Sequence, residues 1–118
     1  MPAPKPEKEI PVTATIESDD HEAFVLRLGK VVANRGKVHD VGKTRSGSMQ
    51  FINFTGNQRG RFVGIVKREN LEAVTEALGG DPKSVLTGKD IELRGEIVLY
   101  KGVPEIVVTS ADQIRVRE

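Results

Sequence analysis

The last third of the chain holds the pattern that most restricts its possible folds. Residues 90–100, DIELRGEIVLY, alternate with a period of two, as the two faces of a β-strand do. One face carries Ile91, Leu93, Gly95, Ile97 and Leu99, and the other carries Glu92, Arg94, Glu96, Val98 and Tyr100. Lys101 and Gly102 then form a tight turn, and residues 104–109, PEIVVT, predict the returning strand. A hairpin with one apolar face must bury that face against the rest of the chain.

The preceding residues predict three more strands and two helices. A β-rich stretch at 10–16 precedes a short helix at 20–28, which the polar residues 18–20 can cap. Strands are expected at 31–41, 49–55 and 61–67, with turns at 43–48 and 56–60 between them. Gly36 inside the first of these strands suggests a bulge or sharp coil. Residues 69–80 have the apolar spacing of an amphipathic helix, formed by Leu71, Val74 and Leu78.

This order of elements predicts a mainly β protein of the OB-fold class. An OB-fold is a five-stranded Greek-key barrel with a helix between strands three and four, and this chain adds an N-terminal helix. The apolar side of the 69–80 helix is expected to plug one end of the barrel. A small mixed α+β sheet is the alternative, but the central glycine and the short strands favour the barrel. We expect residues 1–9 to be a flexible Pro/Lys/Glu linker and residues 10–118 to be a single domain.

Composition excludes several classes of protein. The 118 residues include no cysteine, so disulfides, thiolate catalysis and cysteine-ligated metals are impossible. No apolar run approaches the ~18 residues that a membrane-spanning helix needs, so no membrane insertion is expected. The first nine residues lack the apolar region of a signal peptide. The expected protein is soluble, and the sequence allows either the cytoplasm or export after loss of a signal segment.

The charge is distributed unevenly. Between Lys30 and Arg68 there are nine basic residues and one acid, Asp40, which gives this segment +8 within a chain of net charge +1. A segment of this kind is typical of an electrostatic binding face for a polyanion. The alternative is that lysine and arginine simply solvate exposed strands.

Two of the five aromatic residues lie three apart in the segment SGSMQFINFTG, residues 46–56. Side chains three apart in a strand point to opposite faces, so Phe51 and Phe54 cannot both face the same core. Either could be the inner one on hydrophobicity alone. An outer Phe51 could stack on a nucleic-acid base, or it could be covered by the N-terminal helix through Phe24 or Leu28.

Four segments carry a resemblance to a known family. They are GKVV at 29–32, GKV at 36–38, SGSMQFINF at 46–54 and GKDIELRGEIVLYKGVPEIVVTSADQI at 88–114. Together they resemble bacterial nucleic-acid-binding OB-fold domains of the tRNA-anticodon-binding-like superfamily, over about residues 10–114. The resemblance implies that Phe51 faces outward to stack on a base while Ile52 and Phe54 enter the barrel. It also implies that Phe62, Gly64 and Val66 face inward and that Arg61, Val63 and Ile65 face outward.

The chain departs from the family in two places. Thr55 and Gly56 follow the second strand, where anticodon-binding domains have Arg-Asp, and Asn34 stands where an inward apolar residue is expected.

We therefore expect a module that binds single-stranded DNA or RNA with little sequence preference. The expected binding residues are Arg35, Lys37, Lys43, Arg45, Phe51, Asn53, Arg59, Arg61 and Lys101. The alternative function is an OB-fold protein–protein or envelope interaction module, tethered by its N-terminal linker and binding another protein or a neighbouring domain.

The residues give no indication of an enzyme, and no cofactor is expected. His39 and Asp40 are adjacent in a strand, so they point to opposite faces and cannot easily cooperate as an acid–base pair. A metal-dependent nuclease would need clustered carboxylates, and the basic segment contains a single acid. Glycine loops that bind phosphate are also missing from the starts of both expected helices.

Overall fold

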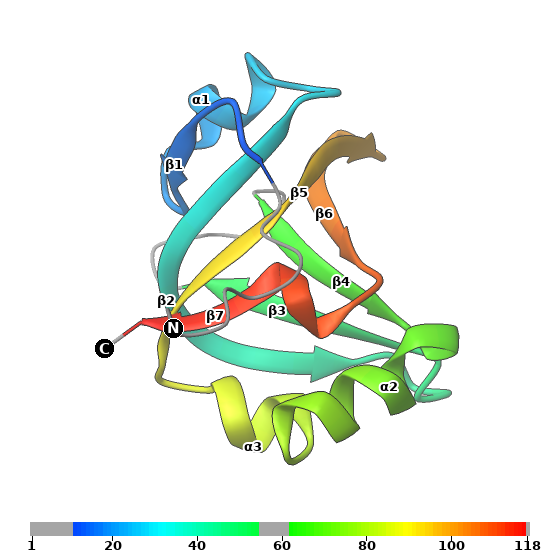
Figure 1. The fold of residues 1–118 in the computed structure, drawn as a ribbon. Helices are drawn as coiled ribbons and strands as arrows, with labels where there is room; N and C mark the ends of the chain where they lie inside the picture. Colours follow the sequence, from blue (N-terminus) through cyan, green and yellow to red (C-terminus); the bar gives the residue numbers. More distant parts are fainter. Residues whose placement is uncertain (1–10, 55–61, 118) are drawn as a thin grey trace, which may run out of the picture.

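A computed structural model of the chain describes residues 11–54 and 62–117. The expected linker at 1–9, the turn at 56–60 and the candidate residues Arg59 and Arg61 lie outside the described residues. The described elements are β1 (Thr15–Glu17), α1 (His21–Val25), β2 (Val31–Lys43), β3 (Met49–Phe54), β4 (Val63–Lys67), α2 (Arg68–Leu78), α3 (Pro82–Leu86), β5 (Asp90–Tyr100), β6 (Val103–Val108), the 3-10 turn η1 (Ala111–Gln113) and β7 (Ile114–Arg117). The fold is mainly β, as the sequence predicts (Figure 1).

The strands form one sheet that closes back on itself. Their order is β1-β2-β3-β4-β6-β5-β7, and β2 also pairs with β5. The pairings therefore run from β2 through β3, β4, β6 and β5 and return to β2, while β1 and β7 flank this ring (Figure 1). The β4–β6 pair is parallel and the other four pairs of the ring are antiparallel. This ring defines an OB-like fold and differs from the open α+β sheet that was the alternative.

Strand β2 pairs with two strands of the ring, β5 and β3, because it is long and bends. Its residues 31–37 pair with β5, and its residues 38–43 pair with β3. The register shifts between Val38 and Asp40, so the bulge lies after Gly36 and not at it. Gly36 is needed for another reason. A Cβ at this position would collide with the Ser18 hydroxyl and lie 3.2 Å from the Phe54 ring.

The inside of the ring is filled with aliphatic and aromatic side chains. Ile52 and Phe54 of β3 are buried there, together with Phe62 and Val66. Phe24 of α1 stacks on Phe62, with ring centroids 4.2 Å apart and planes 6° from parallel. Helix α1 therefore contributes its aromatic ring to this core and not to a cover over Phe51.

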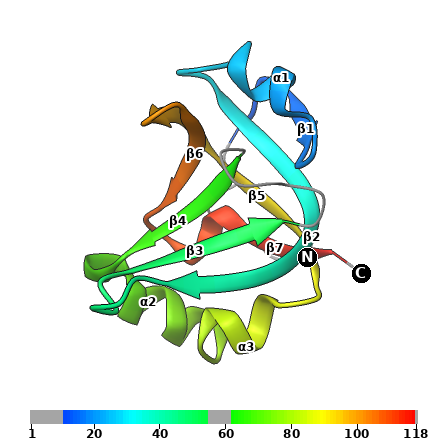
Figure 2. The same ribbon diagram turned by 180° about the vertical axis from the view of Figure 1, so that it is seen from behind.

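Helix α2 packs against the core through the residues that its spacing predicts. Val74 is fully buried, and Leu71 and Leu78 are partly buried against the core cluster. In Figures 1 and 2 α2 and α3 lie together at the opposite end of the molecule from α1.

Some elements differ from the sequence prediction. Strand β1 begins at Thr15, although the β-rich stretch begins at residue 10. Helix α3 was not predicted, yet its start has a clear signal, since the Asp81 carboxylate accepts a hydrogen bond from the Lys83 N–H and Pro82 occupies the first turn. Strand β7 and the preceding η1 turn were also missed.

Asn34 is a polar residue at an interior position of β2. It is fully buried, and its amide nitrogen and oxygen both have no hydrogen-bond partner among the described residues. Burying such a group without a partner costs about 1–3 kcal/mol. Asn34 is therefore a polar residue buried at an inward position, between Ile16 of β1 and Leu93 of β5, where the sequence comparison leads one to expect an apolar residue.

The inward position of Phe54 and the outward position of Phe51 predict different effects on stability. Phe54→Ala should lower the free energy of unfolding by ~3–5 kcal/mol, because a fully buried aromatic leaves a cavity. Phe51→Ala, its matched control on the same strand, should lower it by about 1 kcal/mol or less, because that ring is only half-buried. Urea unfolding of both variants measures the difference. Equal losses would place both rings in the core.

Candidate nucleic-acid interface

The outer side of the ring carries a hollow over β3, β4 and the β5–β6 hairpin. Its volume is about 260 Å³. It is lined by Met49, Phe51, Ile65, Lys67, Tyr100 and Glu105. We call this surface the pocket face. Figure 2 views the ring from the side on which β3 and β4 lie next to each other in front.

The register of the strands explains how these side chains meet. Phe51 pairs with Ile65 of β4 on one side and with Gly42 of β2 on the other. Because Gly42 has no side chain, β2 does not cover that flank of the Phe51 ring. Ile65 is buried although it lies on the outer side, since the surrounding residues of the hollow cover it. Phe51 stays half-buried, with part of its ring open to solvent.

A second aromatic residue reaches the hollow from the end of β5. Tyr100 is 58% exposed and precedes the Lys101–Gly102 turn. The Lys101 ammonium lies 5.4 Å from the centre of the Tyr100 ring, within range of a cation–π contact. The pocket face thus combines two partly exposed rings with a lysine next to one of them.

A carboxyl group also lines the hollow. Burial raises the pKa of Glu105 above its usual value, and the positive charge of Lys67 only partly opposes this effect. A raised pKa means that the ionised form of Glu105 is disfavoured at this position.

The predicted binding residues do not all lie on the pocket face. Phe51 lines the hollow, and Asn53 shares its side of β3. Arg45 is exposed in the turn between β2 and β3, which leads into Met49. Lys101 lies next to Tyr100.

The other described candidates lie elsewhere. Arg35 and Lys37 belong to the half of β2 that pairs with β5, opposite Glu92 and Asp90. Lys43 lies at the end of β2, 4.0 Å from the carboxylate of Asp81.

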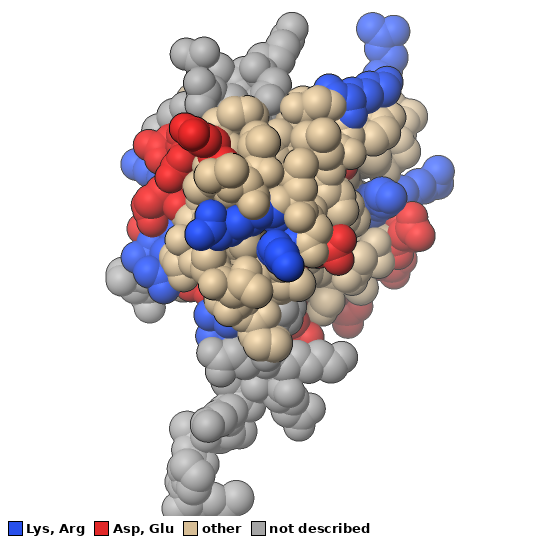
Figure 3. Space-filling model, turned by 90° about the horizontal axis from the view of Figure 1, so that it is seen from above, with Lys and Arg blue, Asp and Glu red and all other residues tan. Residues whose placement is uncertain are grey.

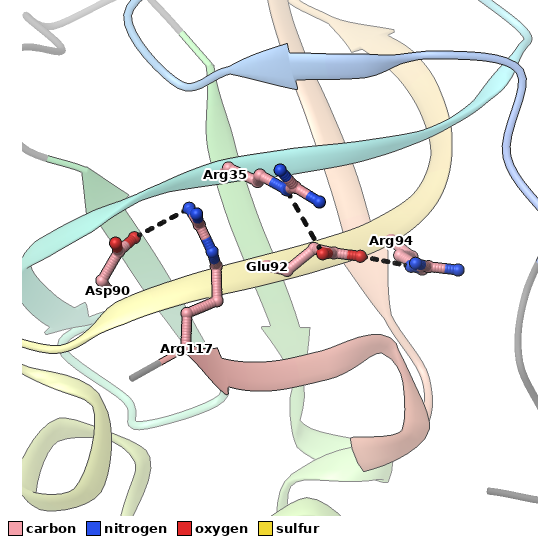
Figure 4. Close-up of polar contacts among 5 residues, drawn as sticks. All are labelled: Arg35, Asp90, Glu92, Arg94 and Arg117. Carbon is pink, nitrogen blue, oxygen red and sulfur yellow. Dashed lines mark hydrogen bonds and ion pairs between the residues drawn. The ribbon is translucent and has the colours of Figure 1, made fainter. Parts of the chain in front are cut away.

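Arg35 belongs to a network on a second surface, formed by β2, β5 and β7, which we call the charged face (Figure 4). The Glu92 carboxylate lies between two guanidinium groups, 3.4 Å from Nε of Arg35 and hydrogen-bonded to Nε of Arg94. Burial raises the pKa of Glu92, but the hydrogen bond and charge of Arg94 and the contact with Arg35 outweigh it and hold the pKa below its usual value. On the same face Arg117 contacts Asp90 at 3.5 Å.

The positive charge of residues 30–68 is therefore partly neutralised in the fold. Acidic residues from the rest of the chain contact Arg35 and Lys43. Lys83 acts in the opposite direction, because it contacts the one acid of the segment, Asp40, at 3.1 Å and offsets its negative charge. Figure 3 shows one end of the molecule, on which basic and acidic side chains occur side by side and not as one continuous basic surface. The charge count along the sequence could not reveal these long-range pairs.

Sequence reasoning missed most of the residues that surround Phe51. Met49, Lys67, Tyr100 and Glu105 were not among the candidates, although strand alternation already put Tyr100 on the outer side of its strand. The β3–β4 and β5–β6 registers determine which outer residues of different strands meet. These registers cannot be deduced from the sequence.

No group of three or more His, Asp or Glu side chains among the described residues is arranged to hold a metal ion. None of the described helices is both long and apolar enough to cross a lipid bilayer.

Comparison with known proteins gives structural matches alone. No family model matches the chain, and no curated protein matches its sequence. The fold is similar to that of a chain assigned as an aspartyl-tRNA synthetase from Leishmania major Friedlin, with a TM-score of 0.52 and 14% identity over 98% of this chain and 22% of that chain. It is also similar to asparaginyl-tRNA synthetase from Entamoeba histolytica in complex with asparaginyl-adenylate, with a TM-score of 0.50 and 16% identity over 91% of this chain and 24% of that one.

These matches support the OB-like fold. The chain spans less than a quarter of the length of both synthetase chains. At this level of identity the likeness concerns the fold and not the activity.

The raised pKa of Glu105 predicts a pH-dependent effect on stability. A carboxyl whose pKa is higher in the folded state destabilises the fold as the pH rises above its unfolded value of about 4.3 and the group ionises. Glu105→Gln should therefore be more stable than the wild type at pH 7 and equally stable at about pH 3, where both side chains are neutral. Urea unfolding at both pH values measures this, with the exposed Glu96→Gln on β5 as a control that changes little. A loss of stability at pH 7 would show that the carboxylate makes a favourable contact, such as one with Lys67.

Proposed function

We propose that this chain is a non-catalytic OB-fold module that binds single-stranded nucleic acid with little sequence preference. In this proposal the ring of β2, β3, β4, β6 and β5 is the five-stranded Greek-key barrel of the OB-fold. The observation that carries the proposal is the pocket face, where Phe51 and Tyr100 are partly exposed beside one hollow.

Stacking on bases is the role that we propose for the partly exposed rings of Phe51 and Tyr100. Every base has a π-face, so a ring that is open on one side can stack on a base whatever its identity, at about 1–3 kcal/mol per base. Phe51 lies within a paired strand, and its β2 neighbour Gly42 has no side chain, so one flank of the ring is left accessible to a base. Tyr100 also lines the hollow, is 58% exposed and offers a second platform. Sequence tolerance follows because stacking reads no hydrogen-bond pattern.

Basic side chains around the hollow would bind the phosphate backbone of the nucleic acid. Lys67 lines the hollow, Lys101 lies beside Tyr100 and Arg45 lies in the turn before β3. Phosphates neutralised by these groups release counterions, so affinity should fall as salt is raised. Of the residues predicted from the sequence, we propose Arg45, Phe51, Asn53 and Lys101 as central contacts, together with Lys67 and Tyr100 of the hollow.

The remaining candidates are proposed as outer contacts. Arg35, Lys37 and Lys43 lie away from the hollow, and Arg35 and Lys43 already contact acids, so each should add less to affinity. Arg59 and Arg61 stay in the proposal on the basis of the sequence alone.

Similarity to other proteins gives further support. The sequence resembles OB-fold domains that bind nucleic acid, and the fold is similar to parts of enzymes whose names identify tRNA as what they act on. The proposal covers both DNA and RNA, because neither stacking nor phosphate contact separates them.

An interaction module is the second candidate function. The observation in its favour is a group of exposed apolar residues in and directly after α1, Val25, Leu26 and Leu28, which do not line the hollow. Such exposed groups often mark contacts with another protein.

Substitution of the two rings tests the proposed binding site. Phe51→Ala and Tyr100→Ala should each weaken binding of an oligo-dT or oligo-U strand by ~1–3 kcal/mol, about five- to 150-fold in Kd. Val116→Ala is the matched control, because Val116 is an exposed apolar residue on β7 and should leave Kd unchanged. Fluorescence anisotropy at low salt measures all three.

Two outcomes would contradict the proposal. The function is wrong if the wild type binds no oligonucleotide at low salt. The site is wrong if the wild type binds and both ring variants bind equally well.

A further inference from the structure

A feature beyond the proposed nucleic-acid site lies at the α1 end of the molecule. Residues 19–30 present acidic, apolar and basic side chains to solvent in that order. We define the α1 stripe as Asp19, Glu22, Val25, Leu26 and Lys30. Leu26 is 73% exposed, which is the largest exposure among the large apolar side chains that the structure describes.

The local backbone explains why Glu22, Val25 and Leu26 share one side. In α1 and the turn that follows it, Phe24 points into the core and stacks on Phe62. Residues 22, 25 and 26 have the i, i+3, i+4 spacing of one helix face, and the Leu26 N–H donates to the Glu22 carbonyl at 3.0 Å to continue the turn. Since Phe24 occupies the inner side, Glu22, Val25 and Leu26 face solvent.

A second segment borders the stripe. The Gly29 N–H donates to the Ile97 carbonyl at 2.8 Å, and the Ile97 N–H donates to the Lys30 carbonyl at 3.0 Å. These bonds hold the end of the stripe against β5, which continues to Leu99, 53% exposed. Figures 1 and 2 both show α1 and the β5–β6 turn at the same end of the molecule. Leu28 and Leu99, which lie close in sequence to these hydrogen bonds, are further exposed apolar residues.

The charges of the stripe have a direction. Asp19 and Glu22 lie at its start and Lys30 lies at its end, with Arg27 nearby in the chain. In the part of the chain that the structure describes, none of these charged groups contacts a partner of opposite sign.

We propose that the α1 stripe is a self-association surface that pairs with the same stripe of a second copy of this chain. A two-fold axis makes two identical stripes run in opposite directions. The acidic start of each stripe then faces the basic end of the other, and Val25 and Leu26 of both copies meet in the middle. A surface with acids at one end and bases at the other is complementary to itself in this antiparallel arrangement, which makes a second copy a partner of matching charge.

The interface is small, so the dimer is weak. Sedimentation equilibrium of the full chain without nucleic acid, from about 10 μM to about 1 mM, should show a concentration-dependent dimer. Leu26→Asp should raise the dimer Kd by about tenfold or more, because it places a charge at the apolar centre of the contact. Val116→Asp, at another exposed apolar position, on β7, is the control and should leave the Kd unchanged. Thermal melts check that each variant is folded.

Charge exchange tests the two-fold geometry itself. Glu22→Lys and Lys30→Glu should each raise the dimer Kd by about five- to tenfold, since each change occurs twice in the interface. The double variant Glu22→Lys/Lys30→Glu should return the Kd to within about twofold of the wild type, because the two paired ends are exchanged together.

Three results would overturn the proposal. They are a wild type that stays monomeric over the whole range, a Leu26→Asp variant that dimerises as the wild type does, and a double variant weaker than either single one. None of these results bears on nucleic-acid binding, because the pocket face contributes no residue to the stripe.

Discussion

The double pairing of β2 is the constraint on which the rest of the structure depends. One strand pairs with β5 through its first half and with β3 through its second half, and the shift between Val38 and Asp40 lets it turn from one partner to the other. Gly36 allows Ser18 and Phe54 to approach the same backbone. Without this bent strand the β3–β4 pair and the β5–β6 hairpin would not be joined into a ring. The hollow, which is lined by residues of the β3–β4 pair and of the β5–β6 hairpin, would then not form.

Closure of the ring gives every strand an inner and an outer side, and the two sides have different roles. On β3 the inner side carries Ile52 and Phe54 into the core, whereas the outer side carries Phe51 to the hollow. The outer surface is further divided. The pocket face, over β3, β4 and the β5–β6 hairpin, is mainly apolar and aromatic. The charged face, over β2, β5 and β7, carries a network of paired charges around Glu92. A single-stranded nucleic acid needs rings and available cations, and only the first of these surfaces offers rings.

Much of the fold could be predicted from the sequence, because local patterns determine it. Alternation identified β5 and β6, and apolar spacing identified α2. Strand parity together with the family resemblance put Phe51 outside and Phe54 inside, as the structure has them. Helix α3 and β7 were missed. The N-cap of α3, Asp81 followed by Pro82, is a local signal that can be recognised in the sequence. Strand β7, in contrast, gains its strand conformation from pairing with β5.

The surroundings of the candidate site could be predicted less well, because they depend on contacts between distant residues. Glu105 and Lys67 lie 38 positions apart and meet through the registers of different strands. The same limit applies to charge. Arg35 belongs to the most basic segment, yet its partner Glu92 lies 57 residues further along the chain. A count of charges along the sequence therefore overstates the positive surface that remains in the fold.

The most direct test of the central claim is a map of amide chemical-shift changes by NMR as oligo-dT is added at low salt. Binding at the pocket face predicts the largest changes at residues 49–53, 65–67 and 100–105, with small changes on β7 and at the α1 end. Changes concentrated around Arg35, Glu92 and Arg117 on the charged face would contradict the account, as would the absence of any change at saturating oligonucleotide.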